Sequence, residues 1–502
     1  MNKLDKLLNT VTMYRLTVYG LLMITGSAFV ASSTHFLPYP ITSLLGSLGL
    51  LLAVGFVAHW LLLHAFASAP SGESWIISVL ILFLILKPAQ TPSEYMVLAV
   101  AVIIASASKY VLAFFNRHIF NPVAIALVIL GLLGSGEIYW WVGSKVLLPV
   151  VVIVGLLIVH KIRRFHVVLP FLLFTIVSSG IINGNSPTSI DIIRSSIVSG
   201  PLIFFATIML TEPETTLSTR RKRIIGACFV GLMYGVHFNL GPIFSTPALA
   251  LIFGNIFAYL LSSKRRLHLQ LDSIEVVSPG IYELSFTPNR PLKFRAGQYM
   301  EWTLPHHHAD SRGNRRYFTI ASAPTETQIK LAVRVDTMHS SSFKRALVAL
   351  EPGDYIWASQ LGGDFTLPPR SNKKLVFIAG GIGITPFRSM IRQILDTAEQ
   401  RDITLYYSSV NPEGFTYWHL FNMALKLGLH PNYLITGTTV PQNWFSKTGY
   451  LKADTIMAEV TDYKKAFYYL SGPNVMVKSY KKMLLSAGVP SRHVKTDYFP
   501  GF

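Results

Sequence analysis

The stretch Leu375-Val-Phe-Ile-Ala-Gly-Gly-Ile-Gly-Ile-Thr-Pro386 decides how the C-terminal part of this chain folds. An apolar strand runs into a glycine-rich turn, and a helix is expected to begin near Phe387. Glycine lets the backbone approach a pyrophosphate closely, and the N-terminus of the helix supplies free N–H groups and partial positive charge. The stretch therefore predicts a nucleotide-binding strand–turn–helix, although one glycine-rich turn is a weak signal on its own.

The segments around this stretch predict two domains. From Lys373 onward, strand-like KLVFIAGG, ITLYYSS and AFYYLSGP alternate with helical segments, which is the pattern of a parallel α/β layer. Before it, IEVVSPGIYELSFTP and QIKLAVRVD alternate apolar and polar residues between turn residues, which is typical of an antiparallel β-barrel. We expect the barrel over residues 266–370 and the α/β domain over 371–502.

Residues 1–265 are expected to form an all-α membrane bundle. Of the 502 residues, 51% are hydrophobic and only 14% are charged, which favours membrane spans. About ten apolar stretches could cross about 30 Å of hydrocarbon. They are 12–32, 42–66, 73–87, 94–114, 120–134, 145–160, 167–183, 197–211, 223–238 and 244–262.

Basic residues predict the orientation of this bundle in a cell membrane. The net charge is +19, and Lys and Arg gather at 161–164, 220–223 and 264–266, whereas the other loops carry few. By the positive-inside rule, the N-terminus and the C-terminal domains then lie in the cytoplasm. The charge is explained by contact with anionic lipid, and nucleic-acid binding is not expected because no basic stripe has interleaved aromatics.

The membrane half also contains a repeat. Pro88 and Pro122 are 34 residues apart, as are Pro213 and Pro247. Five spans in each half would give the halves opposite orientations, and interrupted helices in such inverted repeats offer polar backbone to a cofactor or an ion. We expect Asn121-Pro122 and Thr211-Glu212-Pro213 to lie together at the cytoplasmic face.

The order of motifs in the C-terminal half identifies a family. Arg316-Tyr317-Phe318-Thr319 precedes the glycine-rich turn, and Ser471-Gly472-Pro473 and the terminal Phe499-Pro-Gly-Phe502 follow it. This order resembles the ferredoxin–NADP reductase superfamily over essentially the whole of residues 266–502. The resemblance implies an enzyme that binds FAD and oxidises NADH or NADPH.

The resemblance also implies roles for single residues. Arg316 would pair with the flavin pyrophosphate, Phe318 would lie against the isoalloxazine ring, and Thr319 would hydrogen-bond near the flavin N5. Catalytic roles fall to Thr319, Ser471 and Phe502, the last covering a flavin face until nicotinamide displaces it. The further cofactor-binding positions are Tyr317, Arg334, Ser341, Ser342, Gly380, Gly381, Gly383, Thr385, Pro386, Gly472, Pro473 and Met476.

Two positions depart from the family pattern, and one bears on the nucleotide. Phe318 stands where a Tyr is usual, and Ser471 stands where a Cys is frequent. The segment Tyr406-Tyr-Ser-Ser-Val-Asn411 lacks an Arg for a 2′-phosphate, which favours NADH and leaves NADPH open.

The membrane half resembles the flavin-carrying membrane subunit of sodium-pumping NADH:quinone reductases and of the Rnf electron-transport complex. Ser74-Trp75, Phe120-Asn121-Pro122 and Phe205-Ala206 through Thr211-Glu212-Pro213 carry the resemblance. It implies a second flavin, FMN or riboflavin, in the membrane domain. The family's covalent attachment motif is altered around Thr188 and Ser189, so non-covalent binding is expected.

The expected function is a membrane-bound NAD(P)H oxidoreductase. Electrons would pass from NAD(P)H through FAD to the second flavin, and on to a quinone, an extracytoplasmic acceptor or an additional redox protein. The single Cys228 excludes an iron–sulfur relay built by this chain alone, and no metal site is expected at His306-His307-His308. A haem-bearing reductase is a poorer alternative because the membrane histidines lack the required spacing. An ion transporter with a redox regulatory domain is the other alternative.

Overall fold

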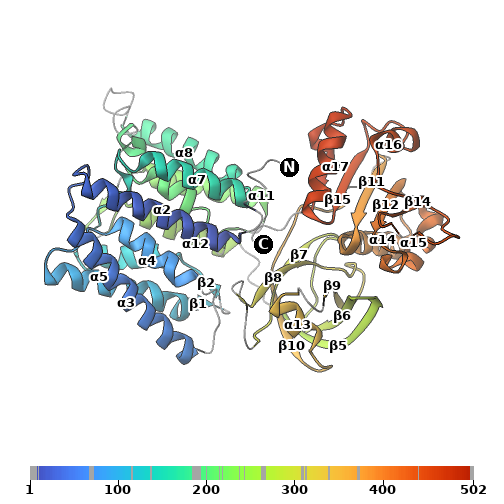
Figure 1. Ribbon diagram of the computed structural model, residues 1–502, viewed down its shortest axis with the longest axis horizontal. Helices are drawn as coiled ribbons and strands as arrows, with labels where there is room; N and C mark the ends of the chain where they lie inside the picture. Colours follow the sequence, from blue (N-terminus) through green and yellow to red (C-terminus); the bar gives the residue numbers. More distant parts are fainter. Residues whose placement is uncertain are drawn as a thin grey trace. The chain divides into compact units, whose positions relative to one another are not determined.

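The computed structural model of the chain comprises two compact units that divide between Lys264 and Arg265 (Figure 1). We call residues up to 264 the helical unit and residues from 265 the sheet unit. The residues that the structure describes are 8, 11–66, 73–114, 117–135, 138–183, 194–198, 200–213, 215–217, 219–236, 238–241, 243–261, 267–306, 310, 314–336, 340–369, 373–438 and 440–497.

The helical unit is a bundle in which the centre is apolar. Helix α4 (Ser74–Ile85) is buried throughout from Ser78 onward, because its neighbours cover every face. The other helical segments are α2 (Met13–Ser33), α3 (Ile41–Phe66), α5 (Pro92–Val111), α6 (Pro122–Leu132), η1 (Trp141–Gly143), α7 (Leu148–Ile162), α8 (Phe165–Asn183), α10 (Leu202–Phe204), the π-helical η2 (Phe205–Met209), α11 (Arg220–Gly235) and α12 (Pro247–Leu261). Two short hairpins, β1 (Ala113–Phe114) with β2 (Arg117–His118) and β3 (Asn239–Leu240) with β4 (Ile243–Phe244), connect helices.

The expectation of about ten membrane spans is wrong in number. Each expected stretch contains a helix, but only three of the described helices are long and apolar enough to cross a membrane: α2, α3 and α5. Five further apolar helices have only 10–17 residues, and about 20 residues are needed to cross the hydrocarbon core. Proline explains part of the difference, since Pro122 and Pro247 stand at the first positions of α6 and α12 and shorten the helices within longer apolar stretches.

The packing order of the helical unit repeats along the chain. Helix α3 packs against α5 and α5 against α6, and in the second half α8 packs against α11 and α11 against α12. Close approach of α8 and α11 depends on small residues. A Cβ at Gly231 would stand 2.6 Å from the carbonyl oxygen of Phe171 on α8. The two halves thus use the same succession of helix pairs.

The sheet unit begins with a six-stranded antiparallel sheet in the order β8-β7-β10-β5-β6-β9. Among the described residues no ladder joins the edge strands β8 and β9, so the expected barrel is not confirmed. A hydrogen bond from the Ala321 N–H to the Lys330 carbonyl (2.9 Å) links the chain just beyond β8 to β9. The elements are β5 (Leu267–Ser278), β6 (Ile281–Pro288), β7 (Tyr299–Thr303), β8 (Arg315–Thr319), β9 (Ile329–Arg334), α13 (Ser342–Val348) and β10 (Tyr355–Gly362).

The rest of the sheet unit is a six-stranded parallel sheet in the order β14-β13-β12-β11-β15-β16, as the alternating pattern predicts. Strand β11 (Leu375–Gly380) is wholly buried, and the chain continues to β12 on one side and returns to β15 on the other. A ligand crevice is expected at such a switch point. The remaining elements are η3 (Gly381–Ile384), α14 (Thr385–Asp396), β12 (Ile403–Ser409), η4 (Pro412–Gly414), α15 (Trp418–Met423), η5 (Ala424–Leu427), β13 (Leu429–Ile435), β14 (Lys447–Thr448), α16 (Ala453–Glu459), β15 (Phe467–Ser471), α17 (Asn474–Ser486), η6 (Ser491–His493) and β16 (Val494–Thr496).

Candidate functional site

The glycine-rich turn lies directly against the end of β15. A Cβ at Gly383 would stand 2.5 Å from the backbone of Gly472, so only glycine permits this approach. A Cβ at Gly380 would meet the Met476 sulfur at 2.4 Å, and Gly381 adopts a left-handed φ of 53°. The structure therefore brings the two predicted nucleotide-binding segments into backbone contact at the switch point of the parallel sheet.

The helix after the turn begins as the sequence predicts. Thr385 and Pro386 form its first turn, and the Thr385 hydroxyl donates to the carbonyl of Ile382 at 3.2 Å. Pro473 precedes α17, which begins shortly after β15 ends. Two helices thus start at one edge of the sheet, where the partial positive charge of their N-termini favours an anionic ligand.

Asp497, which sequence reasoning missed, lies between the two predicted catalytic residues of the described chain. Its carboxylate accepts a hydrogen bond from the Ser471 hydroxyl at 3.2 Å and another from the Thr319 side chain. Its backbone N–H donates to the Leu470 carbonyl at 2.9 Å, which fixes it beside β15. Strand β8, strand β15 and the residue that follows β16 therefore each contribute one polar side chain to a single cluster, which we call the Thr319–Ser471–Asp497 cluster.

Burial changes the proton affinity of this cluster. Loss of solvent raises the pKa of Asp497 from its ordinary 3.8 to about 7, although the hydrogen bonds from Ser471 and Thr319 favour the charged form. A carboxyl group with a pKa near neutrality can release or take up a proton at the pH of a cell. No sequence signal marked Asp497, because it follows a short edge strand outside the recognised motifs.

The predicted flavin strand β8 presents its side chains alternately. Phe318 lies 5.9 Å from the Phe343 ring between centroids, and its carbonyl accepts from the Trp302 indole at 3.2 Å. Tyr317 meets the ring of Tyr299 edge-on at 5.6 Å. Thr319, at the C-terminal end of the strand, is buried. Strand β8 therefore carries two aromatic residues directly before Thr319, and their contact with a flavin stays a prediction.

Arg316 has a protein partner where a pyrophosphate is expected. Its guanidinium is buried, forms an ion pair with Asp310 (2.8 Å), and lies 5.4 Å above the Phe343 ring. Ser342 accepts a hydrogen bond from the Asp310 N–H (2.8 Å), which ties the same segment to α13. The arginine fits a diphosphate chemically, but Asp310 competes for it.

The serines beside Arg316 also have protein partners. Ser341 caps α13 by accepting from the Lys344 N–H at 3.3 Å. His306 Nδ1 lies 2.9 Å from the Leu304 carbonyl, which can only accept, so Nδ1 donates there, and Nε2 forms a hydrogen bond with the Ser342 hydroxyl at 3.0 Å. Contacts from these hydroxyls to a flavin phosphate therefore stay a prediction.

Arg334 stands between the two sheets of the unit. It ends β9, and its guanidinium lies 3.9 Å from where a Cβ of Gly381 would be. An exposed arginine at this place can reach the phosphates of a nucleotide held by the glycine-rich turn. The sequence grouped Arg334 with the cofactor-binding residues, and the structure places it beside the turn.

In the helical unit, the two proline breaks meet. The Asn121 side chain accepts from the Val123 and Ala124 N–H groups and donates to the Glu212 carboxylate at 2.8 Å. Its backbone N–H donates to the buried Asn255 at 2.8 Å. A cavity of about 70 Å³ lies beside them, and its lining includes Ser74, Lys109, Asn121, Pro122, Thr211, Glu212 and Pro213.

Three predicted site residues, Thr188, Ser189 and Phe502, lie outside the described residues. So does most of the histidine run, whereas His306 is described and takes part in the hydrogen bonds above. Among the described residues, no three His, Cys, Asp or Glu side chains lie close enough together to hold a metal ion.

Comparison with known proteins adds the following matches. The family described as oxidoreductase NAD-binding domain matches residues 377–482. The chain is 25% identical over 206 residues to the flavohemoprotein of Xylella fastidiosa, which is 41% of this chain and 51% of that protein. It is 28% identical over 235 residues to the phenol hydroxylase P5 protein of Acinetobacter pittii, covering 45% and 63%. It is 25% identical over 238 residues to the ferredoxin–NADP reductase B of Sorangium cellulosum, covering 46% and 96%.

The chain thus spans about half the length of the first of these relatives and less than two thirds of the second. The family match begins within β11 and ends within α17, so it includes the glycine-rich turn, Ser471 and Met476.

Proposed function

We propose that this chain, whose C-terminal part is an FAD- and NAD-binding domain of the ferredoxin–NADP reductase superfamily, is an NAD(P)H-dependent flavin oxidoreductase. The observation that carries the proposal is the contact of Gly383 with Gly472 next to the Thr319–Ser471–Asp497 cluster. It combines a backbone cradle for a nucleotide with polar groups at the end of the flavin strand.

The chemistry supplied by a bound FAD is the uptake of a hydride from C4 of NAD(P)H and the release of two electrons to an acceptor. The chain's own side chains orient the groups at the site and exchange a proton with it. Thr319 and Ser471 hold hydrogen bonds to Asp497, which fixes both side chains at the meeting of β8 and β15. Asp497 exchanges the proton that accompanies reduction, because its pKa lies near neutrality.

The nucleotide is held by the glycine-rich turn and by Arg334. The two helix starts supply N–H groups to its phosphates, and the arginine supplies charge. The absence of an arginine in Tyr406–Asn411 favours NADH over NADPH, since a 2′-phosphate requires a cation.

For the helical unit we propose a cell-membrane anchor whose cytoplasmic face bears the N-terminus and the sheet unit. The support is the three helices of spanning length and the basic segments at its loops. Resemblance to the membrane subunit of sodium-pumping and Rnf complexes suggests transfer of electrons to a quinone, an extracytoplasmic acceptor or another redox protein.

A second flavin in the helical unit does not fit the cavity between the proline breaks as it stands. A cavity of about 150 Å³ accommodates benzene, whereas this one measures about 70 Å³, and an isoalloxazine ring is far larger than benzene. Asn121 and Glu212 hydrogen-bond each other, so they are engaged in holding the two breaks together. We therefore assign no electron-transfer step to this cavity.

Cofactor content of the purified full-length chain tests the proposal. We expect bound FAD, no Soret band, and NAD(P)H oxidation supported by a quinone in proteoliposomes. A Soret band would favour the haem-bearing alternative. Two flavins per chain would favour a second flavin site away from the small cavity. Solute flux indifferent to NADH, with no electron transfer, would favour a transporter.

A further inference from the structure

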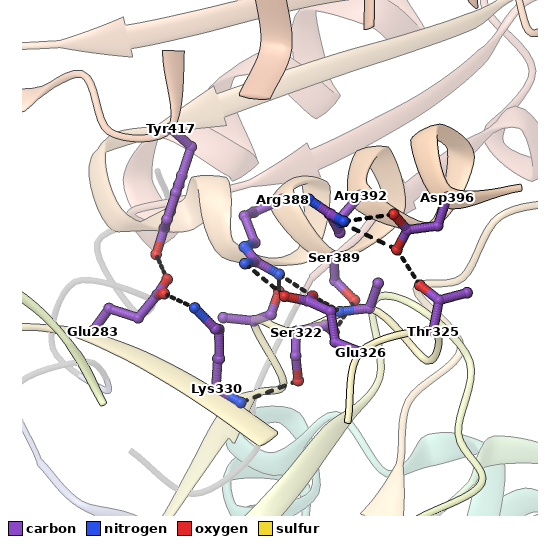
Figure 2. A network of polar contacts seen from close by, with 12 residues as sticks. Glu283, Ser322, Thr325, Glu326, Lys330, Arg388, Ser389, Arg392, Asp396 and Tyr417 are labelled. Carbon is purple, nitrogen blue, oxygen red and sulfur yellow. Dashed lines mark hydrogen bonds and ion pairs between the residues drawn. The ribbon is translucent and has the colours of Figure 1, made fainter. Parts of the chain in front are cut away.

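The two sheets of the sheet unit are joined by a network of polar contacts between α14 and the chain that follows β8 (Figure 2). The contacts concentrate on the segment Ala321–Glu326, which leaves the end of the flavin strand. They meet one face of α14, the helix that begins at the glycine-rich turn.

Arg388 is the centre of this network. Arg388 is 7% exposed, and its guanidinium binds the Glu326 carboxylate with both terminal nitrogens, one of them at 2.9 Å. The same guanidinium donates to the Ala321 carbonyl at 3.2 Å. Glu326 also accepts from the Ala323 N–H at 2.6 Å, so the carboxylate closes the turn that the arginine holds.

Two further hydrogen bonds join the same elements. The Ser389 hydroxyl donates to the Ser322 carbonyl at 2.6 Å, and both serines are fully buried. At the C-terminal end of α14, the Thr325 hydroxyl donates to the Asp396 carboxylate at 2.5 Å. The helix is therefore held along its length rather than at one point.

A second bridge lies beside Arg388. The Glu283 carboxylate of β6 pairs with Lys330 at 2.8 Å and accepts from the Tyr417 hydroxyl at 2.6 Å, as Figure 2 shows. Arg388 lies 5.8 Å above the Tyr417 ring. The buried arginine is thus enclosed by groups from both sheets.

The position of this network relative to the site determines its consequence. Ser322 comes three residues after Thr319, and Arg388 comes three residues after Thr385. Thr319 belongs to the proposed flavin site and Thr385 to the proposed nucleotide site. Three residues further along, Ser322 and Arg388 are bound in the network. Any change in the distance between Ala321–Glu326 and α14 is therefore passed on to the distance between the two sites.

We propose that Arg388 is a positioning residue that sets the approach of the nicotinamide to the flavin. The inference rests on the proposed function, since it assumes FAD at β8 and nicotinamide nucleotide at the glycine-rich turn. Arg388 touches neither ligand in this role. It holds the helix that carries the nucleotide site against the turn that leaves the flavin strand.

The test compares Arg388→Ala and Arg388→Lys with the wild-type full-length protein in detergent. A matched control is Arg392→Ala, one helical turn further, whose ion pair with Asp396 (2.7 Å) stays within α14. Three quantities are measured: affinity for NAD⁺, the rate of flavin reduction by NADH under anaerobic conditions, and the long-wavelength charge-transfer absorbance of the nicotinamide–flavin pair. Hydrogen–deuterium exchange of 320–326 and 385–396 in protein without nucleotide supplies a readout that is independent of activity.

We expect Arg388→Ala to slow flavin reduction about 100-fold, as a displacement of about 1 Å can do, with little change in NAD⁺ affinity. The charge-transfer band should weaken, and both segments should exchange faster. Arg388→Lys keeps the positive charge but loses the bidentate contact with Glu326. Its rate of flavin reduction should therefore lie between the rates of the wild type and Arg388→Ala. Should Arg388→Ala fail to fold, Arg388→Lys and Ser389→Ala carry the test, each with a smaller loss of rate and band intensity.

Unchanged rate, band and exchange in the folded Arg388 variants would overturn the proposal. So would an equal loss in Arg392→Ala, because the effect would then belong to the helix surface in general. If the wild type binds FAD and is reduced by NADH, and the Arg388 variants behave in the same way, only the role of Arg388 is refuted. The proposed function then still holds. Wild-type protein that neither binds FAD nor oxidises NAD(P)H contradicts the proposed function itself.

Discussion

The Ser471 hydroxyl donates a 3.2 Å hydrogen bond to the Asp497 carboxylate, which joins the nicotinamide strand to the last described residue of the chain. Asp497 also accepts from Thr319 on the flavin strand. The cluster thus joins three residues that lie far apart in the sequence: Thr319, Ser471 and Asp497. The protonation of Asp497 within it can be measured.

Asp497→Asn should stabilise the protein, and increasingly so as the pH rises from about 4 to 7. The pKa of Asp497 is about 7 in the folded chain and 3.8 ordinarily, so the folded state binds more protons in this interval and loses stability as the pH rises. Each pH unit between the two values corresponds to about 1.4 kcal/mol, so the gain is at most a few kcal/mol. Melting temperatures of the wild type and Asp497→Asn from about pH 4 to 7 measure this gain in stability. A difference in melting temperature that does not change with pH would refute the prediction.

Ser471→Ala should raise the pKa of Asp497 further, because the lost hydrogen bond favours the ionised carboxyl. The pH profile of flavin reduction by NADH should then have its inflection at higher pH than in wild type. Asp497→Asn serves as the control and should have no inflection near neutrality. An inflection that stays in place in Ser471→Ala would show that another group titrates.

Arg316→Ala should weaken FAD binding, and Asp310→Asn should strengthen it. The arginine offers a charge-assisted hydrogen bond, whose loss typically costs about 1.5–3 kcal/mol. Asp310 pairs with the same guanidinium at 2.8 Å and so competes with a diphosphate. Titration of protein stripped of flavin measures both affinities. Weaker binding in Asp310→Asn would mean that Asp310 orients Arg316 for the cofactor.

Gly383→Ala should abolish nucleotide binding, since its Cβ would stand 2.5 Å from the Gly472 backbone, which cannot yield without moving β15. Overpacking of this kind typically costs about 1–3 kcal/mol of stability. Gly131→Ala in α6 is a matched control, because no atom lies within 4 Å of its added Cβ. Calorimetry with NAD⁺ compares the two variants, and retained affinity in Gly383→Ala would contradict the assignment of the turn.

Asn121→Ala should destabilise the helical unit by about 1–3 kcal/mol, because it removes the cap of α6 and a buried partner of Glu212. A double-mutant cycle with Asn255→Ala measures whether the two asparagines act together. Because Asn121→Ala keeps the backbone N–H that donates to Asn255, full additivity is the expected result, and strong coupling would show that the Asn121 side chain is needed to aim that N–H at Asn255.

The sequence was most informative where local chemistry decides the structure. Apolar Leu375–Ala379 and the glycines that follow predicted the strand and turn, because few other sequences permit such a close approach of backbones. The nucleotide-binding part of that interpretation is supported by the family match over residues 377–482. Asp497 and Arg388 could not be found, since their roles depend on strands and turns that lie far away in the sequence.

Composition predicted more membrane-spanning helices than the described part of the helical unit contains. The stretches expected at 73–87 and 120–134 contain helices of only 12 and 11 residues, which are too short to cross the hydrocarbon core. Strand alternation likewise predicted an antiparallel sheet, but it carries no information on whether β8 and β9 close a barrel.

The most direct test of the account mixes the purified full-length protein, with its bound flavin, with NADH or NADPH in the absence of oxygen and records the flavin absorbance. We expect rapid bleaching of the bound FAD, faster with NADH than with NADPH. Protein that folds and binds FAD but is bleached by neither nucleotide would contradict it.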